Sequence, residues 1–519
     1  MKWQSRFAYG EELYLQKGIR LFASVLSAAI SGMEVCPVQV EADVSSGLPC
    51  FTMVGFPSTQ VKEAQDRVRT ALKNNGISLP PKKVTVNLAP ADLRKEGAGF
   101  DLPVAAAVLA ASGFIEPQLL RNVMVVGELS LNGEVRSVSG VLPRVIRARE
   151  LGCRYCIIPF ENLAEGALVK DMKVVGVQNI KEVLKLVSDP DAFGKENQFS
   201  EVNSEENQVE ESLVDFGEIC GQESARRAAE IAVSGFHNIL FIGPPGTGKT
   251  MLAKRIPTIM PSLTFEESLE LTKIYSIAGL LSPKRPLIKA RPFRSPHHTS
   301  SSAALAGGGR IPGPGEVTLA HRGVLFLDEM PEFARGSLEV LRQPLEDKQI
   351  QLSRASGTYV FPAGFILVAA MNPCPCGYYP DMNKCRCTPG EVSHYLHKLS
   401  QPLLERIDLC ADVPPVNFSQ ISGEKSGESS ALIRKRVEKA RRIQQKRYQN
   451  EKICFNGELS GKQIRKYCVL TENAFQVAKN AFELMELSAR SYHRILKVSR
   501  TIADMEGEEL IHTRHVAEA

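Results

Sequence analysis

Hydrophobic and polar residues follow two different periods in the first part of the chain. After Pro57-Ser58, an N-cap signal, apolar residues recur at the spacing of one helix face, at Val61, Ala64, Val68, Ala71 and Leu72. Residues 84–88 (VTVNL) instead alternate like a half-buried strand. The two periods together predict an α+β domain in this region.

Farther along, short apolar runs each end in a polar motif. Residues 239–242 (ILFI) lead into a glycine-rich octapeptide, residues 324–327 (VLFL) into Asp328-Glu329, and residues 365–370 (FILVAA) into Met371-Asn372-Pro373. Apolar runs of this length that are bounded by turn signals are typical of buried strands. The pattern predicts an α/β core with polar groups at the strand ends.

The octapeptide predicts a phosphate-binding loop, and with it ATP and Mg²⁺ as cofactors. Its glycines let backbone N–H groups turn inward around phosphate oxygens, and the helix that follows adds its positive dipole end. Lys249 would reach the β- and γ-phosphates, and Thr250 would ligate Mg²⁺. The alternative is a chance glycine-rich turn. The loop consists of Gly243, Pro244, Pro245, Gly246, Thr247, Gly248, Lys249 and Thr250.

Asp328-Glu329 has the form of a Walker B motif. Asp328, at the carboxyl end of its strand, can hold the Mg²⁺ shell opposite Thr250, and Glu329 can orient and polarise the attacking water. The alternative is that the two acids only begin a helix. The presence of Glu329 favours an active ATPase over a nucleotide-switched scaffold with weak hydrolysis.

Composition divides the chain without identifying a partner. At 519 residues it exceeds one hydrophobic core, and its net charge of +5 is too small to prove a polyanion partner. An acidic, polar stretch over residues 188–213 predicts a linker. It separates a domain at 21–187 from an ATPase core at 214–418 and a helical lid at 419–519, with residues 1–20 as an extension.

No apolar run approaches the roughly 20 residues that a membrane span needs. Lys17 and Arg20 before an apolar stretch superficially resemble a signal peptide, but the stretch begins late. We therefore expect a soluble, cytoplasmic protein.

Residues 95–103 and 127–136 resemble the proteolytic domain of Lon, which has a ribosomal-S5-like fold. A Lon-type protease uses a Ser–Lys dyad, but this chain has Phe100-Asp101-Leu102-Pro103 where the serine motif would fall, and Leu142 near the expected lysine. A nucleophile needs an adjacent base, and neither partner is recognisable. We expect a proteolytically inactive binding or assembly module.

Three residues match the remaining parts of an AAA+ site. Asn372, at a strand tip, is the candidate for sensor 1. Arg406, within residues 402–408 (PLLERID), resembles an arginine finger, which ring ATPases donate across a subunit interface. Arg490, in the lid, is the candidate for sensor 2. Each arginine has the alternative role of a surface ion pair.

Residues 293–300 (FRSPHHTS), 319–323 (LAHRG) and 372–377 (NPCPCG) resemble the ComM/YifB family of magnesium-chelatase-like AAA+ proteins. The resemblance implies a homohexameric ATPase that drives branch migration of DNA in homologous recombination and natural transformation. The alternative is a chelatase-type motor acting on a partner protein in metal insertion; the Lon-like domain and a cysteine cluster disfavour it.

The resemblance begins near residue 21. Residues 1–20 are therefore an extension or a misassigned start, and Ala519 ends inside an expected helix, which suggests a truncation.

Four cysteines lie within a short segment, as two Cys-x-Cys pairs. Four thiolates suit tetrahedral zinc, and with every position filled by protein the metal would be structural. The spacing is tighter than Cys-x₂-Cys, so reduced thiols and a redox disulfide remain alternatives. The residues are Cys374, Cys376, Cys385 and Cys387.

Two loops are candidates for contact with DNA phosphates. The glycine-rich segment 307–315 contains Arg310, and the alternating segment 348–354 contains Lys348 and Arg354. Such residues would bind single-stranded, branched or duplex DNA without reading bases. Ordinary turn and hairpin structure is the alternative for both. The basic helix expected at 431–450 is either a solvated face or a phosphate or subunit contact.

Overall fold

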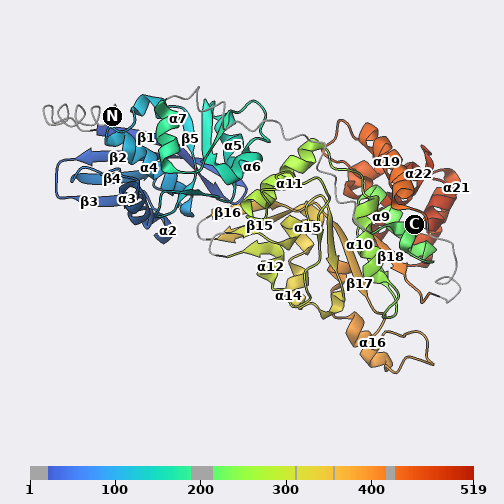
Figure 1. Cartoon of the computed structure of the whole chain (residues 1–519). Coiled ribbons are helices and arrows are strands. Elements are labelled where there is room, and N and C mark those ends of the chain that lie inside the picture. The colour runs from blue at the N-terminus through green and yellow to red at the C-terminus, as the bar shows by residue number, and fades with distance from the viewer. Residues whose placement is uncertain (1–20, 189–213, 310–311, 355–356, 417–426) are drawn as a thin grey trace. The chain divides into compact units, whose positions relative to one another are not determined.

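The computed structural model describes residues 21–188, 214–309, 312–354, 357–416 and 427–519 (Figure 1). The extension 1–20, the predicted linker apart from residue 188, and Arg310 lie outside the described residues. The chain forms two compact units, and the first contains Thr272–Ile288 in addition to the N-terminal part. This short segment lies within residues 214–418, the range expected for the ATPase core.

The N-terminal unit is built on a seven-stranded mixed sheet with the order β3-β4-β2-β1-β5-β8-β9. Strand β1 is antiparallel to β2 and parallel to β5, so the strand pairing changes from antiparallel to parallel at β1, the central strand. The strands are β1 Leu21–Ser31, β2 Glu34–Ser45, β3 Cys50–Val54, β4 Lys83–Ala89, β5 Val123–Val125, β8 Tyr155–Pro159 and β9 Val174–Val177.

The two patterns used to predict this unit are confirmed. Ser58 caps α2 (Thr59–Lys62) by accepting a hydrogen bond from Val61 N, and α3 (Ala64–Asn74) follows with one buried face. The alternating segment lies in β4, where every second residue is buried. Helix α4 (Asp101–Ala111) has no polar face because all of its residues are buried. Also present are α5 (Val141–Glu150) and α7 (Ile180–Ser188).

The second unit contains a five-stranded sheet with the order β11-β14-β17-β10-β18, all of whose pairings are parallel. The strands are β10 Ile239–Ile242, β11 Phe293–Arg294, β14 Val324–Leu327, β17 Ile366–Met371 and β18 Leu409–Asp412. The central strands β14 and β17 are buried throughout, as parallel strands covered by helices are, whereas the edge strands β11 and β18 are partly exposed. The α/β fold class predicted from the sequence is thereby confirmed.

Helices and a hairpin surround the five-stranded sheet of this unit. The hairpin pairs β15 (Gln349–Arg354) with β16 (Gly357–Pro362). The main helices are α9 Glu223–Gly235, α10 Lys249–Ile259, α11 Phe265–Ile277, α15 Arg342–Asp347 and α16 Pro389–Leu396. The last residues of α11, 272–277, belong to the first unit.

The C-terminal part is helical, as expected for a lid. It comprises α19 Ser430–Arg447, α20 Gly461–Tyr467, α21 Glu472–Leu484, α22 Ala489–Glu506 and α23 Thr513–Glu518. Helices α19 and α22 both pack against α9 (Figure 1).

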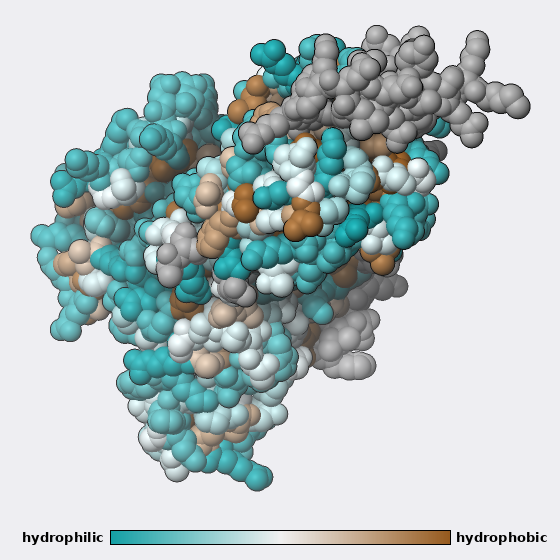
Figure 2. Space-filling view, turned by 90° about the vertical axis from the view of Figure 1, so that its left-hand side faces the viewer, coloured by the Kyte–Doolittle hydropathy of each residue, from teal (hydrophilic) through white to brown (hydrophobic). Residues whose placement is uncertain are grey.

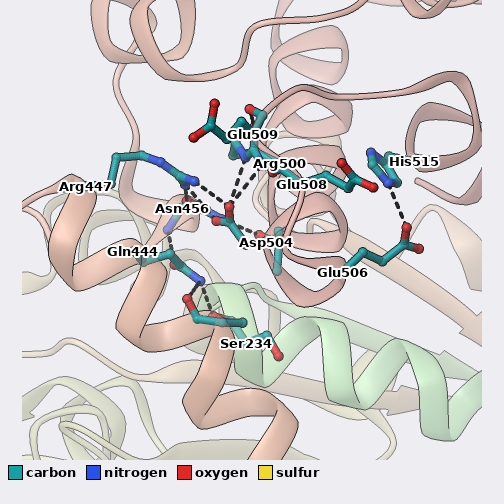
Figure 3. Close-up of polar contacts among 12 residues, drawn as sticks. Ser234, Gln444, Arg447, Asn456, Arg500, Asp504, Glu506, Glu508, Glu509 and His515 are labelled. Atoms are coloured by element: carbon teal, nitrogen blue, oxygen red, sulfur yellow. Dashed lines mark hydrogen bonds and ion pairs between the residues drawn. The ribbon is translucent and has the colours of Figure 1, made fainter.

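A buried polar network joins the lid helices (Figure 3). Asp504 is fully buried and accepts hydrogen bonds from Arg447 Nη1 at 2.7 Å, from Asn456 Nδ2 at 2.8 Å and from Arg500 Nε at 3.2 Å. Gln444 extends the network to α9 by donating to Ser234 O at 2.9 Å. Asp504 thus balances two guanidinium groups inside the lid.

We expect Asp504→Asn to lower the free energy of unfolding by about 3–5 kcal/mol, because the near-isosteric amide leaves the buried Arg500 and the half-buried Arg447 without their counter-ion. Denaturant unfolding followed by circular dichroism measures this. The matched control is Glu506→Gln on the same helix: Glu506 pairs with His515 at 3.0 Å but is partly exposed, so its loss should cost no more than about 1 kcal/mol. Equal losses for the two variants would contradict this account of the lid core.

Polar side chains dominate the face of the molecule in Figure 2, and hydrophobic residues there are scattered. Among the described residues, no helix combines the length and apolarity needed to cross a membrane.

Candidate nucleotide site

Strand order brings the three predicted motifs together. Strand β17 lies between β10 and β14 and runs parallel to both. The carboxyl ends of the three strands therefore meet at one edge of the sheet, which is where open α/β sheets bind ligands. The phosphate-binding loop follows β10, Asp328 follows β14, and Asn372 follows β17.

The hydroxyl of Thr250 and the carboxylate of Asp328 are in direct contact. Thr250 Oγ1 donates to Asp328 Oδ2 at 2.7 Å, although the residues are 78 positions apart. Glu329 is exposed and takes the left-handed conformation, with a φ of 51°. This bend separates the two neighbouring carboxylates: Asp328 faces Thr250, whereas Glu329 lines an adjoining cavity.

The side chain of Lys249 folds back onto the start of the loop. Its Nζ donates to the backbone oxygens of Gly243 at 2.7 Å and Pro244 at 2.8 Å, and to Asn372 Oδ1 at 3.1 Å. Burial lowers the pKa of Lys249, and the nearby Asp328 and Glu329 carboxylates act against that shift. The structure thus places the candidate sensor 1 amide within hydrogen-bonding distance of the loop lysine.

Gln222 supports the loop and was not recognised in the sequence. It is buried at the start of α9, and its Nε2 donates to Pro414 O at 2.6 Å and Thr247 O at 3.3 Å. It thereby ties the loop to the segment that follows β18. A single glutamine after Gly221 carries no motif, so only the tertiary fold could identify it.

A cavity of about 700 Å³ opens beside Glu329 and Asn372. Its other wall comes largely from α16 and the segment before it. Thr388 and Glu391 form a capping box, a pattern readable in sequence, but the pattern does not tell which way the helix faces. The residues not foreseen are Glu332, Pro375, Thr388, Gly390, Glu391, His394, Tyr395 and Lys398.

Arg406 and Arg490 do not join this group. Asn238 immediately precedes β10, and its Nδ2 donates to Arg406 O at 2.8 Å, which puts Arg406 at the amino edge of the sheet. Arg490 Nη2 donates to Glu346 Oε1 at 2.8 Å, and Arg406 binds the other oxygen of the same carboxylate. The two candidate arginines therefore lie together, at the sheet edge opposite the phosphate-binding loop.

The described candidates for DNA contact separate into two environments. Lys348 ends α15 with a left-handed φ of 54°, and its Nζ lies 5.8 Å from the ring centroid of Phe236. Burial lowers the pKa of Lys348. Lys348 is half-buried and directly precedes β15, and its role as a phosphate contact stays a prediction. Arg354 is exposed near the hairpin tip.

The N-terminal unit shows no nucleophile at the position considered for proteolysis. Asp101 is fully buried and accepts from Arg67 Nε at 2.7 Å, and Leu142 is fully buried as well. These side chains stabilise the unit.

The four clustered cysteines are not disulfide-bonded, and their Sγ atoms lie within 4.8 Å of one another.

Comparison with known proteins assigns all three parts of the chain. The family model "Magnesium chelatase, subunit ChlI" matches residues 215–421, "Subunit ChlI of Mg-chelatase" matches 40–162, and "Magnesium chelatase, subunit ChlI C-terminal" matches 427–519.

Two relatives match over nearly their whole length. Competence protein ComM of Haemophilus influenzae is 44% identical over 501 residues, which is 96% of each chain. Uncharacterized protein YifB of Escherichia coli is 43% identical over 496 residues, 95% of this chain and 96% of its own. A shorter match, 30% identical over 185 residues and 34% of this chain, is to DNA repair protein RadA of Listeria monocytogenes. The chain belongs to the ComM/YifB family of magnesium-chelatase-like AAA+ ATPases.

Proposed function

We propose that this protein is a ring-forming, Mg·ATP-dependent DNA translocase that promotes branch migration during homologous recombination and natural transformation. The observation that carries the proposal is the division of the predicted catalytic residues between the two edges of one sheet. The names of two relatives, a competence protein and a DNA repair protein, support DNA as the substrate. We further propose that it works in the cytoplasm, where ATP and DNA are available.

Within one subunit, the loop edge of the sheet would bind and hydrolyse ATP. Backbone N–H groups of the loop hold the phosphates, Lys249 neutralises the β- and γ-phosphate charge, and Thr250 with Asp328 would hold Mg²⁺. Glu329 orients the attacking water, and Asn372 positions that water or the γ-phosphate. The direct contact of Thr250 with Asp328 supports this assignment, because ligands at adjacent positions around one Mg²⁺ lie about 3 Å apart.

The opposite edge would complete the site of a neighbouring subunit. The backbone oxygen of Arg406 lies near the start of β10, whereas the phosphate-binding loop follows the end of β10, which supports a role for Arg406 at a neighbouring nucleotide. Its pairing with Arg490 on Glu346 suggests that both arginines act on the same neighbouring nucleotide. We propose that they exchange Glu346 for phosphate oxygens when a closed homohexameric ring assembles.

The hairpin and the glycine-rich loop are adjacent, which supports a shared surface for DNA. A Cβ atom added to Gly308 would lie 3.6 Å from Arg354 Nη2. Gly308 pairs with Gly313 in the short β12–β13 hairpin (Gly307–Gly308 and Gly313–Pro314), so Arg354 reaches the base of that loop. An exposed arginine beside a glycine-rich backbone suits contact with DNA phosphates without base reading.

We expect Arg354→Ala to weaken DNA binding to about the same degree for different sequences and to reduce the salt dependence of log K by about one phosphate contact. Fluorescence anisotropy with labelled single-stranded and branched DNA over a salt series measures both. Gln351→Ala, at an exposed polar position of the same strand, serves as the matched control. An unchanged salt slope in Arg354→Ala would remove this residue from the DNA surface.

A chelatase-type motor is the second candidate, and the names of all three matching family models favour it. We expected the N-terminal domain to argue against a chelatase-type motor. One of these family models covers residues 40–162, so that argument does not hold. The chemistry of ATP hydrolysis would be the same. The two candidates differ in whether DNA is the substrate.

Branch migration of a synthetic four-way junction tests the proposal. The wild-type protein with Mg·ATP should convert the junction to duplex products, and Glu329→Gln with ATP should not. Conversion that proceeds without ATP, or equally well with Glu329→Gln, would contradict the proposed function.

A further inference from the structure

We propose that Cys374, Cys376, Cys385 and Cys387 bind one Zn²⁺ ion and that this metal positions the wall of the nucleotide pocket. The inference has two parts. The metal site stands on its own geometry, whereas its role at the pocket rests on the proposed ATPase function.

The sulfur positions fit a tetrahedral metal site. Cys374 Sγ lies 3.4 Å from Cys376 Sγ and 3.8 Å from Cys385 Sγ, and the last two sulfurs are 3.6 Å apart. A tetrahedron with Zn–S bonds of about 2.3 Å has edges of about 3.8 Å. A disulfide would need about 2.05 Å, so these separations favour a metal over a redox pair.

Backbone groups around the sulfurs form the outer shell expected of such a site. The N–H groups of Gly377 and Tyr379 point at Cys374 Sγ, at 3.2 and 3.4 Å. Hydrogen bonds of this kind stabilise a thiolate, which is the form that binds zinc. Any thiol protons are released to solvent when the metal binds.

The segment between the two cysteine pairs has little apolar packing of its own. Tyr378, Tyr379 and Met382 are exposed, at 40%, 45% and 71%. The small buried cluster here consists of the cysteines and Val392. A loop without a hydrophobic core of its own commonly depends on a metal for its structure.

This loop forms part of the nucleotide site. Cys374 follows Asn372 by two residues, and Cys387 directly precedes Thr388, so the cysteine segment joins two parts of the cavity wall. Gly377 packs on the phosphate-binding loop: an added Cβ would lie 2.5 Å from Pro245 Cδ, and its φ is +86°. A metal that fixes the segment therefore fixes Asn372, Pro245 and α16 relative to one another.

The first test is metal content. Full-length wild-type protein, purified without chelators, should contain one zinc per chain by elemental mass spectrometry, with all four thiols free of disulfides. After exchange with Co²⁺ it should show the absorption bands of a tetrahedral cobalt thiolate. Absence of stoichiometric zinc, or a disulfide in the purified protein, would overturn the metal site whether or not the protein hydrolyses ATP.

The second test separates positioning from folding. Cys385→Ser/Cys387→Ser should lose zinc and lower kcat by up to about 100-fold, while binding one nucleotide per chain; misplacing catalytic groups by about 1 Å has an effect of this size. The control is Cys454→Ser, an exposed free thiol in the lid. Zinc loss with an unchanged kcat would overturn the positioning role.

Gly377→Ala makes the test independent of the folding of the cysteine variant. It keeps all four ligands but places a methyl group against Pro245, in a backbone conformation that favours glycine. We expect full zinc content with a reduced kcat. Full zinc content with wild-type kcat would show that the loop does not position the site.

Discussion

Glu329→Gln should bind Mg·ATP with nearly wild-type affinity but hydrolyse it about 100- to 10,000-fold more slowly. The amide keeps the shape of the side chain, whereas it cannot accept a proton from water or polarise it. Because Glu329 faces the cavity and Thr250 pairs with Asp328, the substitution leaves the predicted Mg²⁺ ligands in place. Nucleotide binding by fluorescence and single-turnover hydrolysis measure the two quantities separately.

Lys249→Ala is the companion variant. Removing the cation that neutralises the phosphates should abolish nucleotide binding itself, so hydrolysis and binding fall together.

Glu332→Gln is the matched control for Glu329→Gln. Glu332 lines the same cavity, but it does not lie directly after a strand of the sheet. Full turnover by Glu329→Gln would show that another residue orients the water.

Arg406→Ala should lower kcat by about a thousandfold or more, because an arginine finger stabilises charge only in the transition state. Its own subunit should still bind ATP, since Arg406 lies at the other edge of the sheet. Steady-state ATPase assays with the assembled protein measure the loss. Arg342→Ala is the matched control: Arg342 pairs with Glu339 within its own chain, at 2.9 Å.

Mixing two inactive variants shows where the arginine acts. Arg406→Ala keeps an intact loop edge and Glu329→Gln keeps an intact arginine edge, so mixed rings contain interfaces with both. We expect the mixture to regain activity that neither variant has alone. If Arg406 serves its own chain, or has no catalytic role, mixing will restore nothing beyond the sum of the two.

The strand ends could be predicted from sequence because each short apolar run is followed directly by its functional group. The order of the strands in the sheet could not be predicted from sequence, and that order decides which residues lie close together. It brings Asn372 to Lys249 while leaving Arg406 beyond the start of β10. Local spacing does not encode such long-range pairing, so the sharing of Glu346 by Arg406 and Arg490 became visible only in the fold.

Lys348 shows a different limit. The alternating segment correctly predicted strand β15, but the strand begins one residue later, at Gln349. Lys348 is still the end of α15, and its left-handed backbone directs the side chain toward Phe236. A boundary shift of one residue thus changes the surroundings of this predicted DNA contact, because the ends of elements are the least certain part of a sequence pattern.

ATP hydrolysis with and without DNA tests the central claim most directly. We would measure turnover by the assembled wild-type protein with single-stranded, duplex and branched DNA over a salt series, with Glu329→Gln as the control for contaminating activity. Stimulation by DNA that weakens as salt rises is the predicted result, since phosphate contacts are salt-sensitive. Unchanged turnover with every DNA, while the protein is assembled and binds ATP, would contradict a DNA motor and favour a protein partner of the chelatase type.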